Sequence, residues 1–198
     1  MNAHPPIELY FEFASTYSYL AVHEAPKQNV PFAFRPFLLG PIFASFGWNT
    51  SPFNIYEAKG RYMWRDMERL CEAAGLPFRR PSEFPRNGLL AARIALANES
   101  APWMPELVRR VYRANFAEDR AIEQPSVLDE VLASLGLDGP ALRQAAETPG
   151  VKQALKDRTQ HAVDLGIFGA PTFVVQGELF WGSDRLSQAV ERWNRLGG

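Results

Sequence analysis

Residues 7–37 read IELYFEFASTYSYLAVHEAPKQNVPFAFRPF, and their pattern indicates one class of fold. Ile7–Phe13 is dense in aromatic and branched side chains, which favour a strand buried in a sheet. Ser18–Ala25 spaces its apolar residues as a helix does, and Pro26 ends that helix. Val30–Phe37 has the composition of a second strand. A strand, a helix and a strand within about thirty residues form a βαβ unit, whose strands run parallel.

A long loop and then a helical region follow this unit. Leu38–Pro52 is rich in glycine and proline without a steady period, so we expect a loop that shapes a pocket. Apolar spacing then predicts six helices, which are Ile55–Ala74, Gly88–Asn98, Met104–Ala117, Ser126–Leu135, Ala141–Glu147 and Val151–Leu165. Their ends carry signals: Gly75 is a C-cap candidate, Ser126 with Asp129 resembles a capping box, and Thr148 precedes a proline at the first helical position.

Strands return near the C-terminus. Pro171–Val175 and Glu178–Gly182 flank the turn Gln176-Gly177, which predicts a β-hairpin, and Asp184–Trp193 is the final helix. The order βαβ, helices, ββα matches an α/β thioredoxin-like fold with an all-α helical insertion. We therefore predict a thioredoxin-like domain made of residues 1–54 and 167–198, with a helical insertion domain at residues 55–166.

The composition excludes several classes of protein. The chain has 198 residues, 46% hydrophobic and 22% charged, so it can form a large core and is not a disordered chain. Twenty-one Lys and Arg against 22 Asp and Glu give a formal net charge of -1, which argues against nucleic acid or an anionic membrane as a partner. The sequence has no apolar run of about 18 residues and no basic leader, so we expect a cytoplasmic protein.

Cysteine and histidine are too few for disulfide or zinc chemistry. Cys71 is the single cysteine, which excludes an intramolecular disulfide and a two-cysteine redox motif, and we expect it to be a small buried hydrophobe. His4, His23 and His161 lie in unrelated segments with no carboxylate at ligand spacing, so we predict no metal site.

Two short motifs are candidates for chemistry. In a thioredoxin-like fold the reactive group lies between the first strand and the first helix, where free backbone N–H groups stabilise an anion. Ser15-Thr16-Tyr17-Ser18 occupies this turn, and its hydroxyls can donate a hydrogen bond to the sulfur of a bound thiol or simply cap the helix. Ala170-Pro171 begins the third strand, either as a cis proline that binds an extended peptide such as glutathione or as the opening of an edge strand.

Several segments together resemble one enzyme family. They are FEFASTYSYLA, PFLLGPIF, NIYEAKGRYMWRDMERL and LGIFGAPTFVVQGELFWGSDRL, and they span nearly the whole chain. The chain resembles 2-hydroxychromene-2-carboxylate isomerase, a family related to the kappa-class glutathione transferases. The resemblance implies a thioredoxin-like domain with a helical insertion, bound glutathione, and a homodimer.

The resemblance assigns the serine turn a role. Ser15 matches the family's active-site serine, which lies near the glutathione sulfur. In many relatives a proline follows that serine, whereas this chain has Thr16, a second hydroxyl that can alter the surroundings of the sulfur.

The resemblance also implies a set of contacts to glutathione. Besides Ser15, the matching residues are Asn54, Lys59, Ala170, Pro171, Ser183 and Asp184. Ala170 and Pro171 match the backbone clamp on the cysteinyl part, while Ser183 and Asp184 match the residues that receive the γ-glutamyl end. Without the family, Lys59 is a surface lysine and Asp184 an ordinary N-cap.

Other residues are candidates for binding the substrate. Phe43 and Trp48 supply flat apolar surface in the glycine-rich loop, a plausible wall for a small aromatic substrate. Arg61 can hold a carboxylate and Tyr62 can hydrogen-bond a phenol, although each can instead have a purely structural role. Arg35 and Arg65 are further candidates for holding a carboxylate, and Tyr10 for hydrogen-bonding a phenol.

The function implied by the resemblance is a glutathione-dependent isomerisation. The family interconverts 2-hydroxychromene-2-carboxylate and trans-o-hydroxybenzylidenepyruvate in the degradation of aromatic compounds, by reversible addition of a thiolate. Two alternatives stay open. One is a kappa-like transferase that conjugates electrophiles to glutathione, and the other is a non-redox thioredoxin-like binding module.

Overall fold

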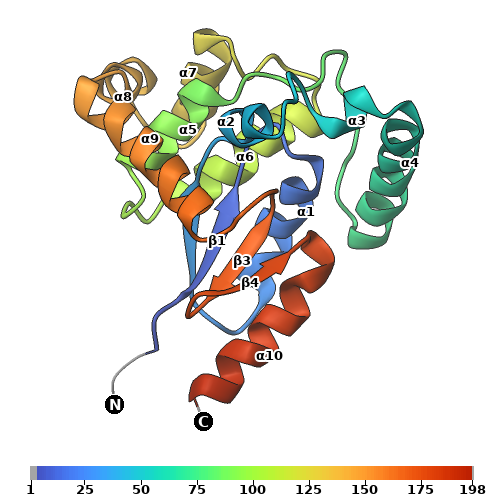
Figure 1. Ribbon diagram of the computed structural model, residues 1–198. Coiled ribbons are helices and arrows are strands. Elements are labelled where there is room, and N and C mark those ends of the chain that lie inside the picture. The colour runs from blue at the N-terminus through green and yellow to red at the C-terminus, as the bar shows by residue number, and fades with distance from the viewer. Residues whose placement is uncertain (1–3, 198) are drawn as a thin grey trace.

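A computed structural model describes residues 4–197 of the chain (Figure 1). Its one sheet has the strand order β2-β1-β3-β4, with the strands β1 (Ile7–Phe11), β2 (Phe32–Pro36), β3 (Thr172–Val175) and β4 (Glu178–Trp181). β1 runs parallel to β2 and antiparallel to β3, and β3 pairs antiparallel with β4. The predicted βαβ unit and the predicted C-terminal hairpin are therefore confirmed.

Most of the helices gather at one end of this sheet. The helices of the described residues are α1 (Thr16–Glu24), α2 (Leu39–Ser45), α3 (Pro52–Ile55), α4 (Glu57–Ala74), α5 (Leu89–Ala97), α6 (Met104–Phe116), α7 (Pro125–Ala133), α8 (Gly139–Ala146), α9 (Pro149–Asp164) and α10 (Leu186–Gly197), with 3-10 turns η1 (Ala25–Lys27) and η2 (Ser183–Arg185). Figure 1 shows α2 and α5 to α9 gathered above the sheet, where β1 ends, whereas α10 runs down beside β3 and β4. No helix within residues 4–197 is long and apolar enough to cross a membrane.

The segment predicted as one long loop, Leu38–Pro52, contains a helix. This prediction was wrong because α2 is stabilised by contacts with residues outside the segment. Leu39 and Ile42 are buried in a cluster with Tyr10 and Phe37. Pro41 is compatible with the helix because it lies in the first turn, where no intrahelical N–H bond is needed.

Other helix starts also differ from the prediction. The helix predicted to begin at Ile55 is split at Tyr56 into α3 and α4, and Ser51 caps α3 by accepting a hydrogen bond from the backbone N of Phe53. The capping box proposed at Ser126 is wrong, because α7 already begins at Pro125. Its carboxylate partner, Asp129, instead forms an ion pair with an arginine on α8.

Two predicted helix boundaries are confirmed. Gly75 has a φ of 65° and ends α4 in the left-handed conformation, as expected of a C-cap glycine. Thr148 is the N-cap of α9, with Pro149 at its first position. Gly166, with a φ of 84°, follows the last turn of that helix.

The core lies on both faces of the sheet. Leu9 and Phe11 of β1 belong to a large cluster with α1 and α10, whereas Tyr10, between them in sequence, packs on the opposite face. The large cluster continues without a break into the helical insertion, where it includes Val108 and Tyr112 of α6. The two parts of the chain therefore share one core, and the boundaries at residues 54/55 and 166/167 stay a prediction.

Candidate functional site

A cavity of about 1540 Å³ opens where the sheet meets the helical insertion. The turn between β1 and α1, the start of β3, the end of β4, the segment from α2 to α3 and the loop 84–89 all contribute to its walls. Typical small-molecule sites have volumes of roughly 300–1,000 Å³, so this one has room for two ligands side by side.

A second cavity of about 470 Å³ lies between α1, α6 and α7. Its arginines already have carboxylate partners: Arg109 and Arg110 share Glu106, and Arg120 pairs with Glu118. We therefore take the larger cavity as the candidate site.

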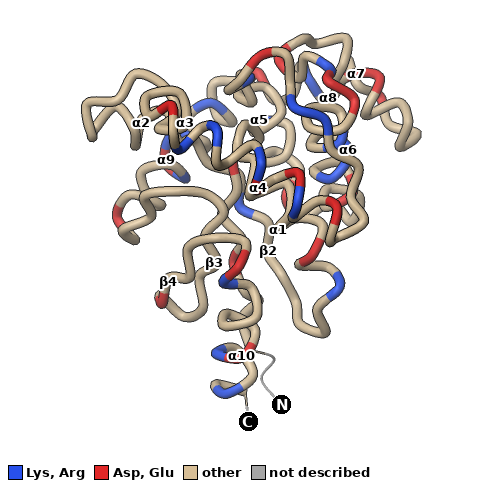
Figure 2. Tube along the Cα trace, turned by 90° about the vertical axis from the view of Figure 1, so that its right-hand side faces the viewer, with Lys and Arg blue, Asp and Glu red and all other residues tan. Residues whose placement is uncertain are grey.

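Figure 2 shows basic and acidic residues interspersed along the helices, with no face of one sign. Recognition by this protein therefore depends on individual side chains in the cavity rather than on a general field.

Ser15 joins the two predicted motifs. It is the N-cap of α1, because its Oγ accepts a hydrogen bond from the backbone N of Ser18 over 3.3 Å. The same hydroxyl donates to the carbonyl oxygen of Ala170 over 2.9 Å. The Ala170-Pro171 peptide bond is cis, which is the first of the two alternatives that the sequence left open. Motifs 155 residues apart are thus in direct contact, and both line the cavity.

The first turn of α1 holds a further hydroxyl without a partner. Thr16 Oγ1 is buried and makes no hydrogen bond within the described part of the chain. Thr16 also lines the cavity. A buried polar group without a partner is costly, so this turn has unused hydrogen-bonding capacity at the place where the helix exposes its N–H groups.

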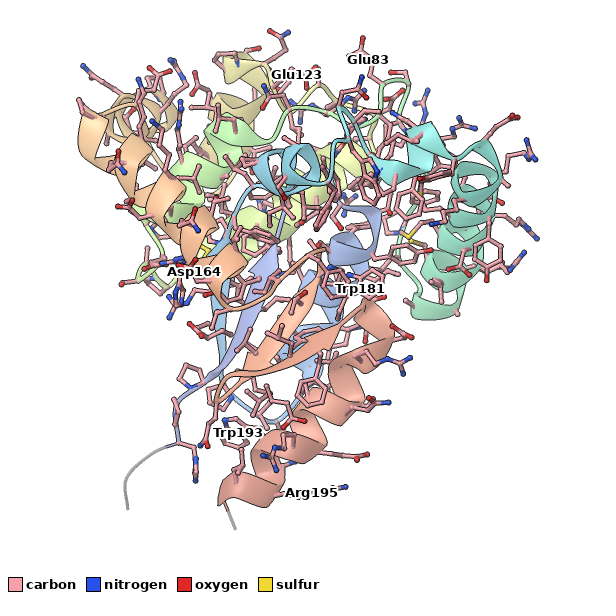
Figure 3. The ribbon with its side chains drawn as sticks, in the orientation of Figure 1. Glu83, Glu123, Asp164, Trp181, Trp193 and Arg195 are labelled. Carbon is pink, nitrogen blue, oxygen red and sulfur yellow. The ribbon has the colours of Figure 1, made fainter. Side chains whose placement is uncertain are left out.

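The end of β4 forms another wall. Gly169 lies against the ring of Trp181, and a Cβ built on Gly169 would be 2.5 Å from Nε1 of that ring. The exposed rings of Trp181 and Phe168 are in edge contact, with centroids 4.8 Å apart. Figure 3 shows Trp181 at the end of β4, close to the start of α10.

Ser183 and Asp184 follow Trp181 in η2 and line the same cavity. The side chain of Asp184 is 71% exposed, and its Oδ2 lies 3.5 Å from Nη2 of Arg185. Asp184 is therefore an accessible carboxylate that already has one cation beside it.

The two polar residues predicted near α3 and α4 differ in position. Lys59 lines the cavity and its Nζ lies 4.9 Å from the centroid of the Tyr56 ring. Asn54 is not among the lining residues: its Nδ2 donates to the carbonyl oxygen of Phe84 over 3.0 Å and to Thr50 Oγ1 over 3.3 Å. Asn54 thus anchors the loop 84–89 rather than facing the cavity.

Arg61 and Tyr62 do not line the cavity. Arg61 forms an ion pair with Glu57 on the surface, and Tyr62 is 61% exposed. The phase of α4 explains this, because Gly60 and Met63 occupy its buried face and the two residues between them point outward. Arg35 and Arg65 do not line the cavity either. Arg35 pairs with Glu8 and Glu99, and Arg65 pairs with Glu68.

The predicted aromatic residues do line the cavity. Phe43 and Phe46 of the α2 region flank Trp48, with ring centroids 5.7 and 5.5 Å from that of Trp48. Together they form a continuous apolar wall, suited to a flat aromatic molecule.

Two polar groups of the cavity, Tyr17 and Glu12, were not predicted from the sequence. Tyr17 OH donates to Asp66 Oδ2 over 3.0 Å, and burial together with this hydrogen bond raises the pKa of Tyr17. Glu12 is a partly buried carboxylate in the cavity wall, and burial raises its pKa to about 7. The available signal was the charge of Glu12 between the apolar residues Phe11 and Phe13.

Cys71 is buried as predicted. Burial raises the pKa of its thiol to about 12, so it supplies no thiolate near neutral pH.

Comparisons with known proteins show the family of the chain and its fold. The family model described as DSBA-like thioredoxin domain matches residues 6–193. The 2-hydroxychromene-2-carboxylate isomerase of Sphingobium xenophagum is 29% identical over 186 residues, covering 91% of this chain and 93% of the relative. Glutathione S-transferase kappa 1 of Homo sapiens is 27% identical over 209 residues, covering 94% and 92%. A solved structure of 2-hydroxychromene-2-carboxylate isomerase superposes with a TM-score of 0.83 at 22% identity, covering 96% and 95%.

Proposed function

Because the chain belongs to the family of DSBA-like thioredoxin domains, we propose that it is a glutathione-dependent isomerase. The proposed reaction interconverts 2-hydroxychromene-2-carboxylate and trans-o-hydroxybenzylidenepyruvate in the degradation of aromatic compounds. One observation carries this proposal: a serine, not a cysteine, caps α1 and contacts Ala170-Pro171 in a cavity large enough for a cofactor and a substrate. The similarity to an isomerase of that name supports it.

The residues of the cavity fit glutathione. The backbone of Ala170 at the start of β3 would pair with the cysteinyl part as an added strand does. Asp184 and Ser183 would receive the γ-glutamyl ammonium and carboxylate, and Lys59 is a cation available to a second carboxylate. The unpartnered hydroxyl of Thr16 adds hydrogen-bonding capacity that the protein itself does not use.

The chemistry of the reaction requires rotation about a carbon–carbon double bond. When bound, glutathione supplies a thiolate that adds reversibly to this bond and leaves after rotation. Ser15 and the N–H groups at the start of α1 would stabilise the negative charge of the sulfur. The wall of Phe43, Phe46 and Trp48 would hold the aromatic ring and exclude water.

A kappa-like transferase is the second candidate. The observation that favours it is the 27% identity to a kappa-class transferase, close to the 29% found for the isomerase. The same residues would bind glutathione in either enzyme. The two functions differ in the fate of glutathione, which is regenerated by an isomerase and ends in an adduct with a transferase.

The test is a calorimetric titration with glutathione followed by spectrophotometry on the chromene. We expect binding, isomerisation and full recovery of glutathione. Binding with stoichiometric loss of glutathione to an adduct would favour the transferase, and the absence of binding heat would favour a non-redox binding module.

A homodimer is part of the same proposal, on the basis of the family resemblance. Light scattering of the purified protein measures the mass directly, and we expect about twice the 22.3 kDa of one chain.

A further inference from the structure

The carboxylate of Glu12 lies in the wall of the cavity next to the serine turn. Ser15 N donates to the carbonyl oxygen of Glu12 over 2.8 Å, which closes a tight turn with these two residues at its ends. Oε2 of Glu12 accepts a hydrogen bond from Ala14 N over 3.1 Å. Within residues 4–197 the carboxylate of Glu12 accepts this one hydrogen bond and forms no ion pair. Glu12 and Ser15 both line the cavity.

The side chains of α6 near Glu12 hydrogen-bond the backbone and not the carboxylate of Glu12. From α6, Tyr112 OH donates to the carbonyl oxygen of Glu12 over 2.6 Å, and Asn115 Nδ2 donates to that of Phe13 over 3.1 Å. A Cβ on Gly88 would be 3.4 Å from Oε1 of Glu12, so the loop 84–89 lies directly against the carboxylate.

The cationic residue of that loop, Arg86, has partners other than Glu12. Arg86 is buried, and its Nη2 forms an ion pair with Asp119 Oδ1 over 2.6 Å. Its Nη1 donates to the carbonyl oxygen of Arg120 over 2.8 Å. The guanidinium of Arg86 is therefore satisfied without Glu12.

An unpaired carboxylate in a partly buried wall favours its protonated form. Burial is the largest cause of the raised pKa of Glu12, about 7, and the hydrogen bond from Ala14 N opposes it. Such a group gains and loses a proton near neutral pH, which is the property required of a general acid and base.

We propose that Glu12 accepts the proton that leaves the thiol of bound glutathione and returns it when the thiol is restored. This inference rests on the proposed function. In the forward step the S–H bond breaks, an O–H bond forms on a carboxyl oxygen of Glu12, and the electron pair stays on sulfur. The return step is the reverse, so no further reactant is needed.

Electrostatics makes the coupling obligatory. A thiolate and an ionised Glu12 in one cavity of low polarity repel each other, so the pair retains one proton and titrates as a unit. The proton resides on Glu12 while the sulfur is charged, because the N–H groups at the start of α1 stabilise the sulfur anion, whereas no residue among 4–197 forms an ion pair with the carboxylate.

The test counts protons while glutathione binds to the full chain. Calorimetry at about pH 7.5, in buffers of different ionisation enthalpy, gives the protons released, and ultraviolet absorbance gives the thiolate formed. For the parent we expect thiolate with little proton release. For Glu12→Gln we expect several-fold less thiolate, with each thiolate releasing one proton. Glu12→Asp keeps an acid and should retain part of the parent behaviour, while Glu72→Gln, an exposed control on α4, should match the parent.

The pH profile of isomerisation is the second readout. The acid limb of kcat/KM should reflect Glu12, near pH 7, and it should disappear in Glu12→Gln with a loss of about 100-fold at neutral pH. A purely structural role would lower the rate without moving this limb.

The outcomes separate the two proposals. If the parent binds glutathione and releases one proton for each thiolate, or binds it without forming thiolate, the role of Glu12 is refuted and glutathione dependence stands. If Glu12→Gln matches the parent in proton release and pH profile, the role is refuted as well. If the parent does not bind glutathione, the proposed function itself fails and the role of Glu12 fails with it.

Discussion

Replacing Ser15 by alanine separates its structural role from its chemical role. The hydroxyl accepts one hydrogen bond as the N-cap of α1 and donates another to Ala170. Losing the helix cap lowers the free energy of unfolding by about 1 kcal/mol, and losing the hydrogen bond to Ala170 lowers it by about 1 kcal/mol more. In a domain of this size 1 kcal/mol corresponds to roughly 2–4 °C, so Ser15→Ala should lower Tm by about 4–8 °C.

The effect of Ser15→Ala on the rate is limited by the same geometry. To donate to the sulfur, the hydroxyl must give up its bond to Ala170. A hydrogen bond to a charged partner is worth about 1.5–3 kcal/mol, and subtracting about 1 kcal/mol for the bond that is lost leaves a net of roughly 0.5–2 kcal/mol. Each 1.4 kcal/mol is tenfold, so isomerisation should slow by about 2- to 30-fold.

The assay compares Ser15→Ala with a cap variant remote from the cavity. Asp138 caps α8 by accepting from Ala141 N over 3.0 Å, and Asp138→Ala removes a cap alone. It should lower Tm by about 2–4 °C and leave the rate unchanged. Thermal unfolding and isomerisation are measured on both variants. A Ser15→Ala protein with a lowered Tm but the parent rate and the parent thiol pKa would refute the role of Ser15 in stabilising the sulfur.

Three further perturbations test the surrounding structure. Gly169→Ala should destabilise the protein by about 1–3 kcal/mol and weaken glutathione binding, because the added methyl meets the neighbouring indole, whereas Gly150→Ala, with open space around it, should do neither in unfolding and calorimetric measurements. Arg86→Met should cost about 1–3 kcal/mol in denaturant unfolding, because it removes the buried donor to the carbonyl oxygen of Arg120 and the ion pair with Asp119, which keeps its bonds to Ser82; an unchanged midpoint would contradict this. The contribution of Glu12 to the stability of the free protein should fall as pH rises from 4.5 to about 7, by at most about 3 kcal/mol, because folding raises its pKa, whereas the lowered pKa of His23 acts in the opposite direction, so the difference between the parent and Glu12→Gln in this window measures the contribution of Glu12.

The strands and most helices were predictable because their signals are local. The alternation in β1 sends Leu9 and Phe11 to one face and Tyr10 to the other, and each face has its own core cluster. The helix α2 was not predictable in this way. Its seven residues include Gly40 and Pro41, and its stability comes from burial against β1 and the segment after β2. Such contacts are invisible in a short window of sequence.

The candidate site was predictable where a motif fixed the position and not where packing did. Ser15 and Ala170 come from two turns whose contact follows from the fold. Arg61 and Tyr62 were chosen by residue type alone, and the phase of α4 turns both away from the cavity. Glu12 resembles a solvent-facing strand residue in the sequence, and its burial depends on a loop and a helix that come much later in the chain.

The helical insertion therefore contributes more than a wall to the site. Tyr112 and Asn115 of α6 hydrogen-bond the carbonyl oxygens of Glu12 and Phe13, about 100 residues earlier in the chain, and fix the turn that ends at Ser15. The same helix contributes Tyr112 to the core shared with β1, so the position of the turn is determined by the packing of the whole molecule. A thioredoxin-like unit without the insertion would retain the serine and the proline but would expose Glu12 to water. Exposure would return its pKa towards that of an ordinary carboxyl, and such a group holds no proton at neutral pH.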